Sequence, residues 1–333
     1  MAFFSIAIDA DDYIFYEISS MMHNEPYAGN KIGLDNYTLA ASYHLPYVAL
    51  NLSGITYSRQ SRTLFAITNN PTKVYNLDQG GNFLREIALI GFEDTEGIAY
   101  LGGNLFAIIE EQKHRLTIVE IDNQTTVLDR SKVINSLKMD MKDRDNKGFE
   151  GVAFDDAMRC IYLVNEKRPR QLMTVRGLVA NTEAIKISLN PELVPRRFFL
   201  NDLSGLHFDT VARNLVFVSD ESKMISEVSL DGKRISFLLL KKGFAGLEED
   251  IPQAEGITMD DAGNIYLVSE PNLLYRFARK AEGALERVNR SRPGAAKAEN
   301  YSWSGTAAPS FLGVVTPRQQ ASDRLKSLQE QTP

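Results

Sequence analysis

The chain has 333 residues, of which 44% are apolar and 24% are charged, and its formal net charge is −6. This balance is typical of a soluble globular protein and shows no basic excess, so we expect no nucleic-acid partner. The single cysteine, Cys160, excludes an internal disulfide, and one cysteine with four scattered histidines excludes a metal cage of thiolates or imidazoles.

Residues 1–33 are interpreted as an N-terminal extension. The apolar run Met1–Ile8 ends at Asp9, well short of the roughly 20 residues that a membrane span needs. This run also lacks the basic n-region of a signal peptide. Residues 36–43 follow as one isolated strand pattern ahead of the first repeat.

A short phrase then recurs five times along the chain. Its copies are Leu52-Ser53-Gly54-Ile55, Thr95-Glu96-Gly97-Ile98, Phe149-Glu150-Gly151-Val152, Leu203-Ser204-Gly205-Leu206 and Ala254-Glu255-Gly256-Ile257. The intervals between the glycines are 43, 54, 54 and 51 residues, which is the spacing of propeller blades.

Each repeat carries short runs rich in β-branched and aromatic residues. In the first repeat the predicted strands are 53–57, 63–68, 73–77 and 83–89, separated by turns rich in Asn, Asp and Gly. The last repeat lacks a fourth run, so we expect the isolated strand 36–43 to complete that blade and close the ring. The predicted fold is an all-β, five-bladed β-propeller over residues 34–280, followed by a disordered C-terminal tail, 281–333.

Polar residues occupy two equivalent points of every repeat. The residues before the phrase glycine form an inner ring: Ser53, Glu96, Glu150, Ser204 and Glu255. The residues that end the next strand form a second ring: Asn70, Glu111, Glu166, Glu221 and Glu270. Because the two strands are antiparallel, both rings are expected at one mouth of the central channel. A shift of one residue would instead bring Asn69, Glu110, Asn165 or Asp220 into the second ring.

Seven glutamates at one mouth repel one another, and bound cations, raised carboxyl pKa values or basic partners would relieve that repulsion. Oxygen ligands without His or Cys favour Ca²⁺, with Mg²⁺ or Mn²⁺ as alternatives. The predicted metal ligands are Glu96, Glu150 and Glu255, which stand nearest the axis, with the second ring, Ser53 and Ser204 as candidate further ligands. The alternative is that the second ring forms ion pairs with nearby basic residues: Lys113, Lys167, Arg168, Lys223 and Arg276.

The chain resembles the bacterial SdiA-regulated family, also called YjiK-like, over about residues 36–278. The resemblance rests on Thr95–Tyr100, Gly148–Ala153 and above all on Gln253–Ile257 followed by Gly263–Asn272. It implies a five-bladed propeller distantly related to NHL repeats, with a calcium site. It also implies a membrane anchor and a place on the periplasmic face of the inner membrane. No anchor is visible in this chain, so a cytoplasmic location is the alternative.

The resemblance implies no established reaction, and no catalytic residue is assigned. We expect a calcium-binding scaffold that takes an unidentified small molecule or protein at the channel mouth. The alternative is a calcium-dependent hydrolase, of the lactonase, esterase or phosphoesterase type, acting at the same metal. His207, on the predicted inner strand of the fourth repeat, is either a channel base or a structural histidine.

Overall fold

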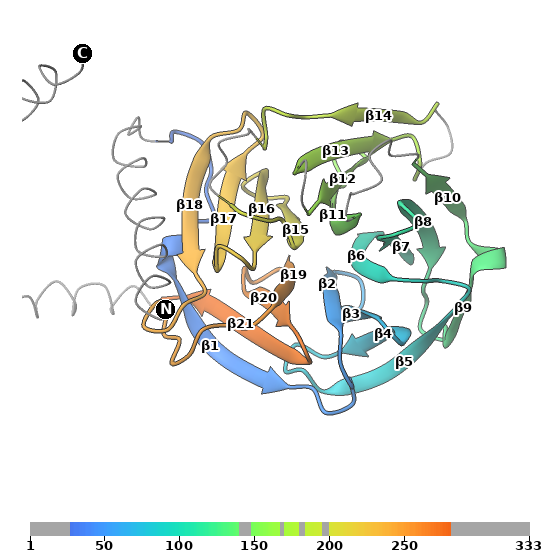
Figure 1. Ribbon diagram of the computed structural model, residues 1–333, viewed down its shortest axis with the longest axis horizontal. Coiled ribbons are helices and arrows are strands. Elements are labelled where there is room, and N and C mark those ends of the chain that lie inside the picture. The colour runs from blue at the N-terminus through green and yellow to red at the C-terminus, as the bar shows by residue number, and fades with distance from the viewer. Residues whose placement is uncertain (1–26, 140–147, 167–169, 180–183, 195–199, 281–333) are drawn as a thin grey trace, which may run out of the picture. The chain divides into compact units, whose positions relative to one another are not determined.

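The computed structural model describes residues 27–139, 148–166, 170–179, 184–194 and 200–280. Five antiparallel sheets surround a central axis and form the blades of a five-bladed β-propeller (Figure 1). Most of the predicted N-terminal extension and all of the predicted tail lie outside the described residues. None of the helices in the described ranges has the length and apolar character needed to cross a membrane.

Each blade runs from an inner strand at the axis to an outer strand at the rim. Blade 1 consists of β2 (Leu52–Ser58), β3 (Thr63–Asn69), β4 (Thr72–Leu77) and β5 (Phe83–Ile90). Blade 2 consists of β6 (Thr95–Gly102), β7 (Leu105–Glu110), β8 (Arg115–Glu120) and β10 (Asn135–Lys138). Blade 3 consists of β11 (Phe149–Asp155), β12 (Cys160–Asn165), β13 (Gln171–Arg176) and β14 (Lys186–Leu189). Blade 4 consists of β15 (Gly205–Asp209), β16 (Asn214–Ser219), β17 (Met224–Ser229) and β18 (Arg234–Leu239).

Blade 5 joins strands from the two ends of the propeller. It consists of β19 (Ala254–Met259), β20 (Ile265–Ser269), β21 (Leu273–Arg279) and β1 (Tyr37–His44). The antiparallel ladder between β1 and β21 extends from the Tyr37–Arg279 pair to the His44–Leu273 pair. Strand β1 is therefore the fourth strand that the last repeat lacks.

One strand was not expected from the sequence. Strand β9 (Val127–Asp129) adds to the rim of blade 1, where it pairs in parallel with β5. The chain then passes through the 3₁₀ helix η2 (Arg130–Lys132) and returns to blade 2 as β10. This excursion links the rims of the two blades, which no repeat pattern would reveal.

The segment before β1 is attached to blade 4 by a buried carboxylate. The backbone N–H groups of Ile32 and Gly33 donate to the Glu227 carboxylate at 2.7 and 3.1 Å. The Asn214 amide also donates to Glu227, at 2.7 Å. The 3₁₀ helix η1 (Leu34–Asn36) follows directly and leads into β1. Glu227 thus holds the chain against blade 4 before it enters blade 5.

The core lies between the blades rather than at the axis. Five clusters of buried apolar side chains fill the five interfaces between neighbouring blades. The cluster between blades 3 and 4 includes Cys160, Tyr162 and Phe217. Alternating strand residues face opposite sides of each sheet, so every blade contributes to two of these clusters.

The phrase glycines are required by close contact between the inner strands. A Cβ atom on Gly54 would lie 2.8 Å from the Glu96 carbonyl oxygen, and one on Gly256 would lie 2.7 Å from the Gly54 Cα. A Cβ atom on Gly205 would overlap the Glu255 carbonyl oxygen. Only glycine allows this backbone approach. At Gly97 and Gly151 a Cβ atom would meet the side chains of Ile109 and Val164, at 2.8 and 2.6 Å. The five positions form a narrow ring, here called the glycine neck: Gly54, Gly97, Gly151, Gly205 and Gly256.

A candidate metal centre at the acidic mouth

The residue before the phrase glycine is the extra residue of a β-bulge in four blades. The ladders shift register between Leu52 and Gly54, Thr95 and Gly97, Phe149 and Gly151, and Ala254 and Gly256. A bulge leaves its extra residue without a ladder partner and re-aims that side chain. Each bulge therefore frees the inner-ring residue of its blade from the regular strand alternation.

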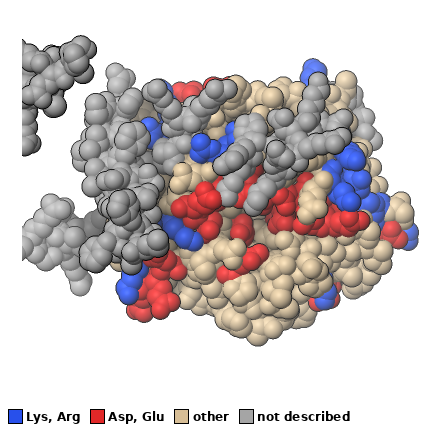
Figure 2. All heavy atoms as spheres, in the orientation of Figure 1, with Lys and Arg blue, Asp and Glu red and all other residues tan. Residues whose placement is uncertain are grey.

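These side chains meet in a cavity of about 350 Å³ at one end of the channel. We call this cavity the acidic mouth. Its lining residues are Asn69, Glu96, Glu111, Glu150, Glu166, Asp202, Ser204, Asp220, Glu221, Gln253, Glu255 and Glu270. Figure 2 shows acidic side chains gathered at the centre of this face of the molecule.

The strand registers define which residues are equivalent in the second ring. The phrase glycines pair with Ile67, Ile109, Val164, Val218 and Val268. The residues two positions after these partners are Asn69, Glu111, Glu166, Asp220 and Glu270. Three of the five predicted positions coincide with this set. In blades 1 and 4 the shift of one residue applies, although Glu221 also lines the mouth.

Two of the residues considered for the second ring, Asn70 and Glu110, do not line the acidic mouth. Asn70 is exposed and is not among the lining residues. Glu110 is buried, pairs with Arg130 and accepts the Glu93 N–H at 3.0 Å. The hairpins differ in length from blade to blade, so counting residues from the glycine could not settle the register.

In four of the five repeats a further polar residue precedes the phrase, and these residues were not predicted. Three positions before the glycine stand Asn51, Asp94, Asp202 and Gln253, and blade 3 has Gly148 there. Asp202 and Gln253 line the acidic mouth. The carbonyl of Asp94 accepts the Glu111 N–H at 2.9 Å, so this position lies beside the second ring. The signal was present in the aligned repeats, one position outside the four-residue phrase.

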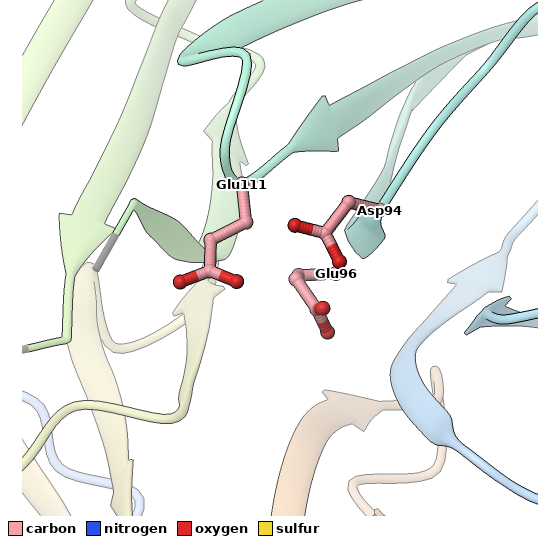
Figure 3. Close-up of side chains that lie close together, drawn as sticks. All are labelled: Asp94, Glu96 and Glu111. Carbon is pink, nitrogen blue, oxygen red and sulfur yellow. The ribbon is translucent and has the colours of Figure 1, made fainter.

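Asp94, Glu96 and Glu111 form the cluster that could hold a metal ion. Each offers a carboxylate oxygen, and these three oxygens lie within 4.8 Å of one another. Figure 3 shows the three carboxylates converging from the start of β6 and the end of β7. Of the three predicted metal ligands, Glu96 belongs to this cluster, while Glu150 and Glu255 line the same mouth outside it.

Neighbouring groups hold the three carboxylates in place. The Gly148 N–H donates to Glu111 Oε1 at 2.9 Å, and the Asn69 side-chain amide donates to Glu96 Oε1 at 2.9 Å. The Gln112 N–H lies 3.3 Å from Asp94 Oδ2. Asn69 Oδ1 is buried beside this cluster and has no hydrogen-bond partner in the described part of the chain. It is a further oxygen that a cation could use.

Burial and like charge raise the pKa values of the inner-ring glutamates. Burial raises the pKa of Glu96 to about 7, with smaller contributions from Glu111 and Asp94. Burial raises the pKa of Glu255 to about 9, aided by the charge of Glu270. The pKa of Glu150 is also raised, by burial and then by Glu96. In the protein without a cation, protons therefore occupy part of the site.

One of the basic residues considered as ion-pair partners of the second ring does pair with a residue of that ring. Lys113 pairs with Glu93 at 2.8 Å rather than with a member of the second ring. Lys223 pairs with Asp220 at 2.5 Å, so one ring position does have a basic partner. Lys167 and Arg168 lie outside the described residues. Ion pairing relieves the repulsion at Asp220, on the side of the mouth formed by blade 4.

The two serines of the inner ring bond to the backbone. Ser204 Oγ donates to the Ala254 carbonyl at 2.6 Å, which ties blade 4 to blade 5. Ser53 Oγ lies 3.2 Å from the Asn51 carbonyl and donates to it. These hydroxyls therefore support the strand starts around the glutamates.

His207 lies at the other end of the channel. It is on β15, two residues after Gly205, and lines a separate cavity with Arg59 and Thr210. Burial lowers its pKa to about 3, and the charge of Arg59 adds to this effect. It is therefore not a base for chemistry at the acidic mouth.

Two solved structures show some similarity to the chain, and one family model matches it. The structure of a nidogen/laminin complex contains a chain with 15% identity and a TM-score of 0.44, covering 66% of this chain and 73% of that one. The luciferin-regenerating enzyme shows 10% identity and a TM-score of 0.46, covering 72% of this chain and 95% of that one. At these values neither similarity supports an argument about this chain. The family model named SdiA-regulated matches residues 30–278, so the chain belongs to the SdiA-regulated family.

Proposed function

We propose that the acidic mouth binds a divalent cation and that the propeller is a ligand- or partner-binding module built around that site. The observation that carries this proposal is the convergence of Asp94, Glu96 and Glu111, whose carboxylate oxygens lie within 4.8 Å of one another. Ca²⁺ is the first choice, and Mg²⁺ or Mn²⁺ are the alternatives.

The chemistry of the donors supports a hard cation. The cluster offers carboxylate oxygens, with the Asn69 amide oxygen beside it, and such sets favour Ca²⁺ over softer metals. Ca²⁺ takes six to eight oxygen ligands, more than three carboxylates supply when each gives one oxygen. The remaining positions would be open to water or to an oxygen of a bound partner. A cation there would also neutralise carboxylates that now repel one another.

The dimensions of the mouth support a binding role. Its volume of about 350 Å³ lies at the lower end of the range for small-molecule sites. Blade 5 adds the carboxylates Glu255 and Glu270 to the lining of the same mouth. A partner that brings an anionic or carbonyl oxygen to the cation, and hydrogen-bond donors to these carboxylates, would match both groups.

One observation favours the hydrolase as a second candidate. Without a cation, the raised pKa of Glu255, about 9, keeps this carboxyl protonated near neutral pH. A bound cation would lower that pKa toward neutrality, which is the range that suits a general acid. Glu150 has a raised pKa in the same mouth. Turnover would then require the side chains of both the cluster and the inner ring.

Calorimetric titration with Ca²⁺ tests the metal site. We expect the wild-type protein to bind Ca²⁺, and Glu96→Gln, Asp94→Asn and Glu111→Gln to weaken binding at least about tenfold by removing a ligand charge. Glu150→Gln and Glu255→Gln should have smaller effects, because these residues lie outside the cluster. Glu120→Gln, at the exposed end of β8, is the matched control.

Two results would overturn the assignment. If the wild type gave no heat of binding with Ca²⁺, Mg²⁺ or Mn²⁺, there would be no cation site. If Glu150→Gln and Glu255→Gln abolished binding while the cluster variants kept it, the ligands would be the residues nearest the axis. The same proteins, assayed on lactones, aryl esters and phosphoesters, separate the two functions. Cation-dependent turnover lost in Glu255→Gln identifies a hydrolase, and cation binding without turnover identifies a binding module.

A further inference from the structure

A second cavity opens at the end of the channel opposite the acidic mouth. Its volume is about 230 Å³, and its walls are the second halves of the inner strands. We call it the His207 cavity. It shares no lining residue with the acidic mouth, whose residues come from the starts of the inner strands and the ends of the strands beside them.

The residues two positions after the phrase glycines create the space. They are Thr56, Ala99, Ala153, His207 and Thr258. Four of these five side chains are small, and His207 alone is large and polar. A ring of five large residues at this level would fill the channel. The small residues leave room for a guest molecule beside the imidazole.

The walls of this cavity are fixed by hydrogen bonds between blades. Thr56 Oγ1 accepts the Tyr100 N–H at 3.0 Å, and Thr258 Oγ1 accepts the Tyr57 N–H at 3.0 Å. Each threonine thus joins its inner strand to the next one around the ring. A site built on such cross-linked strands is formed before a ligand arrives, which lowers the cost of binding.

His207 provides the polar contact inside the cavity. Its ring is part-exposed to the cavity, and no residue in the described ranges forms a hydrogen bond with it. A neutral imidazole carries one N–H donor and one acceptor nitrogen. A guest with a hydroxyl or amide group can use either atom. The lowered pKa of His207 means that the ring stays neutral at physiological pH.

The charged residues at the rim are already compensated. Arg59 Nε lies 3.3 Å from Asp261 Oδ1, and its guanidinium also donates to Thr210 Oγ1 at 2.5 Å. Asp156 pairs with Arg159 at 3.0 Å. Each of these charges has a partner of opposite sign, and the small residues around His207 are neutral, so the cavity favours an uncharged guest.

The glycine neck separates the two ends of the channel. The space between them has a volume of about 10 Å³, which is room for one water molecule at most. An organic molecule in the His207 cavity cannot reach the acidic mouth through this opening. The two sites are therefore independent, and this inference does not depend on the proposed metal.

We propose that the His207 cavity is a second binding site, which takes a small uncharged ring compound bearing a hydroxyl or amide group that hydrogen-bonds to His207. An engineered cavity of 150 Å³ in another protein accepts benzene, so 230 Å³ accommodates one ring with a polar substituent. The apolar floor contacts the ring: Ile55, Ile98, Val152, Leu206 and Ile257.

Benzyl alcohol is a suitable probe, with benzoate as its charged counterpart of similar size. Histidine side-chain resonances of the ¹⁵N-labelled full-length protein should shift for His207 and not for the exposed His44. We expect a dissociation constant of about 1 mM or below for benzyl alcohol and at least about tenfold weaker binding of benzoate. Both values should be the same with EDTA and with Ca²⁺.

Two substitutions test the geometry. His207→Phe keeps a ring but removes the hydrogen-bonding nitrogens, and should weaken benzyl alcohol binding about fivefold to tenfold. Ala99→Leu fills the cavity and should abolish binding. His44→Phe is the matched control and should bind as the wild type does. Thermal melts establish that each variant is folded.

Three outcomes would overturn the proposal. The first is that His207 resonances do not respond to benzyl alcohol at tens of millimolar. The second is that a folded His207→Phe variant binds benzyl alcohol as tightly as the wild type. The third is that benzoate binds as tightly as benzyl alcohol, which would contradict the uncharged character of the site.

Discussion

The two ends of the channel are formed by the same five strands but differ in chemistry. At the strand starts, bulges aim Glu96, Glu150 and Glu255 into a cavity lined by carboxylates. Three residues further along, His207 stands among small neutral side chains. The comparison shows that the same five inner strands contribute to two sites of different charge, one at each end of the channel.

The origin of the difference is local. A bulge places an extra residue at the start of the strand, where charge can collect, whereas regular pairing resumes after the glycine. Beyond the glycine the cavity is defined by which side chains are small. The glycine neck keeps the two environments apart. Substitutions in the glycine neck, the acidic mouth and the His207 cavity therefore test different parts of this comparison.

The largest effect is expected at the glycine neck. Gly205→Ala would press a Cβ atom into the Glu255 carbonyl oxygen, and the inner strands of blades 4 and 5 would have to separate. We expect the free energy of unfolding to fall by about 3 kcal/mol, the cost of forcing an extra group into a packed region. Urea denaturation measures this loss.

Gly80→Ala is the control for that experiment. Gly80 lies in the turn before β5, and a Cβ there would meet the Asp78 side chain at 3.3 Å, not another strand. We expect a change below about 1 kcal/mol. Equal losses in the two variants would show that the neck is not a close contact between strands.

The next effect is the pH dependence of stability, which arises at the acidic mouth. Burial raises the folded pKa values of Glu96 to about 7 and Glu255 to about 9, above the ordinary value of 4.5. The folded protein therefore keeps protons that the unfolded chain releases, and its stability falls as pH rises from about 4.5 toward these values. In EDTA, the melting temperature should be lower at pH 8 than at pH 5, with each group contributing at most about 1.4 kcal/mol per pH unit.

Two comparisons identify the source of that slope. Glu255→Gln should flatten the decline between pH 5 and pH 8, because it removes one of the retained protons, whereas Glu120→Gln should leave the decline unchanged. Stability that increases over this pH range in EDTA would contradict the raised pKa values. Added Ca²⁺ should stabilise the protein more at pH 8 than at pH 5, because protons compete with the cation for the same carboxylates.

The smallest expected effect is the coupling between the two ends. His207→Phe should leave the Ca²⁺ dissociation constant within about twofold of the wild-type value, because distant sites without shared partners behave additively. The calorimetric titration described above measures this constant. A change of tenfold would mean that the glycine neck transmits a rearrangement from one site to the other.

The repeat made the fold predictable. The phrase glycines, the β-branched runs and the turn residues are local signals, and in blade 1 the predicted strands match β2 to β5 within one residue at each end. The ring closure could be predicted because the sequence has one extra strand before the first repeat and lacks one strand in the last. The parallel addition of β9 followed no repeat, so no local pattern indicated it.

The sequence predicted where the site lies but not which residues form the metal cluster. The rule that both polar rings share one mouth depends only on antiparallel pairing, which the blades obey. Which carboxylates come within 4.8 Å of one another depends on bulges and on the length of each hairpin. Asp94 was missed for this reason, and Asn70 was chosen where Asn69 lines the mouth. His207 was considered alone, because the small residues level with it belong to four other strands.

The pairing of β1 with β21 has a consequence for the order of events during synthesis. Strand β1 leaves the ribosome early, but its ladder partner, which ends at Arg279, is made more than 230 residues later. Until then strand β1 has no partner, and blade 5, which carries Glu255 and Glu270, is not formed. Four blades can pair within themselves as they emerge, because each takes its four strands from one stretch of the chain. The acidic mouth is therefore completed last. Its carboxylates come together only after the blades that hold them have formed, so the nascent chain avoids their mutual repulsion.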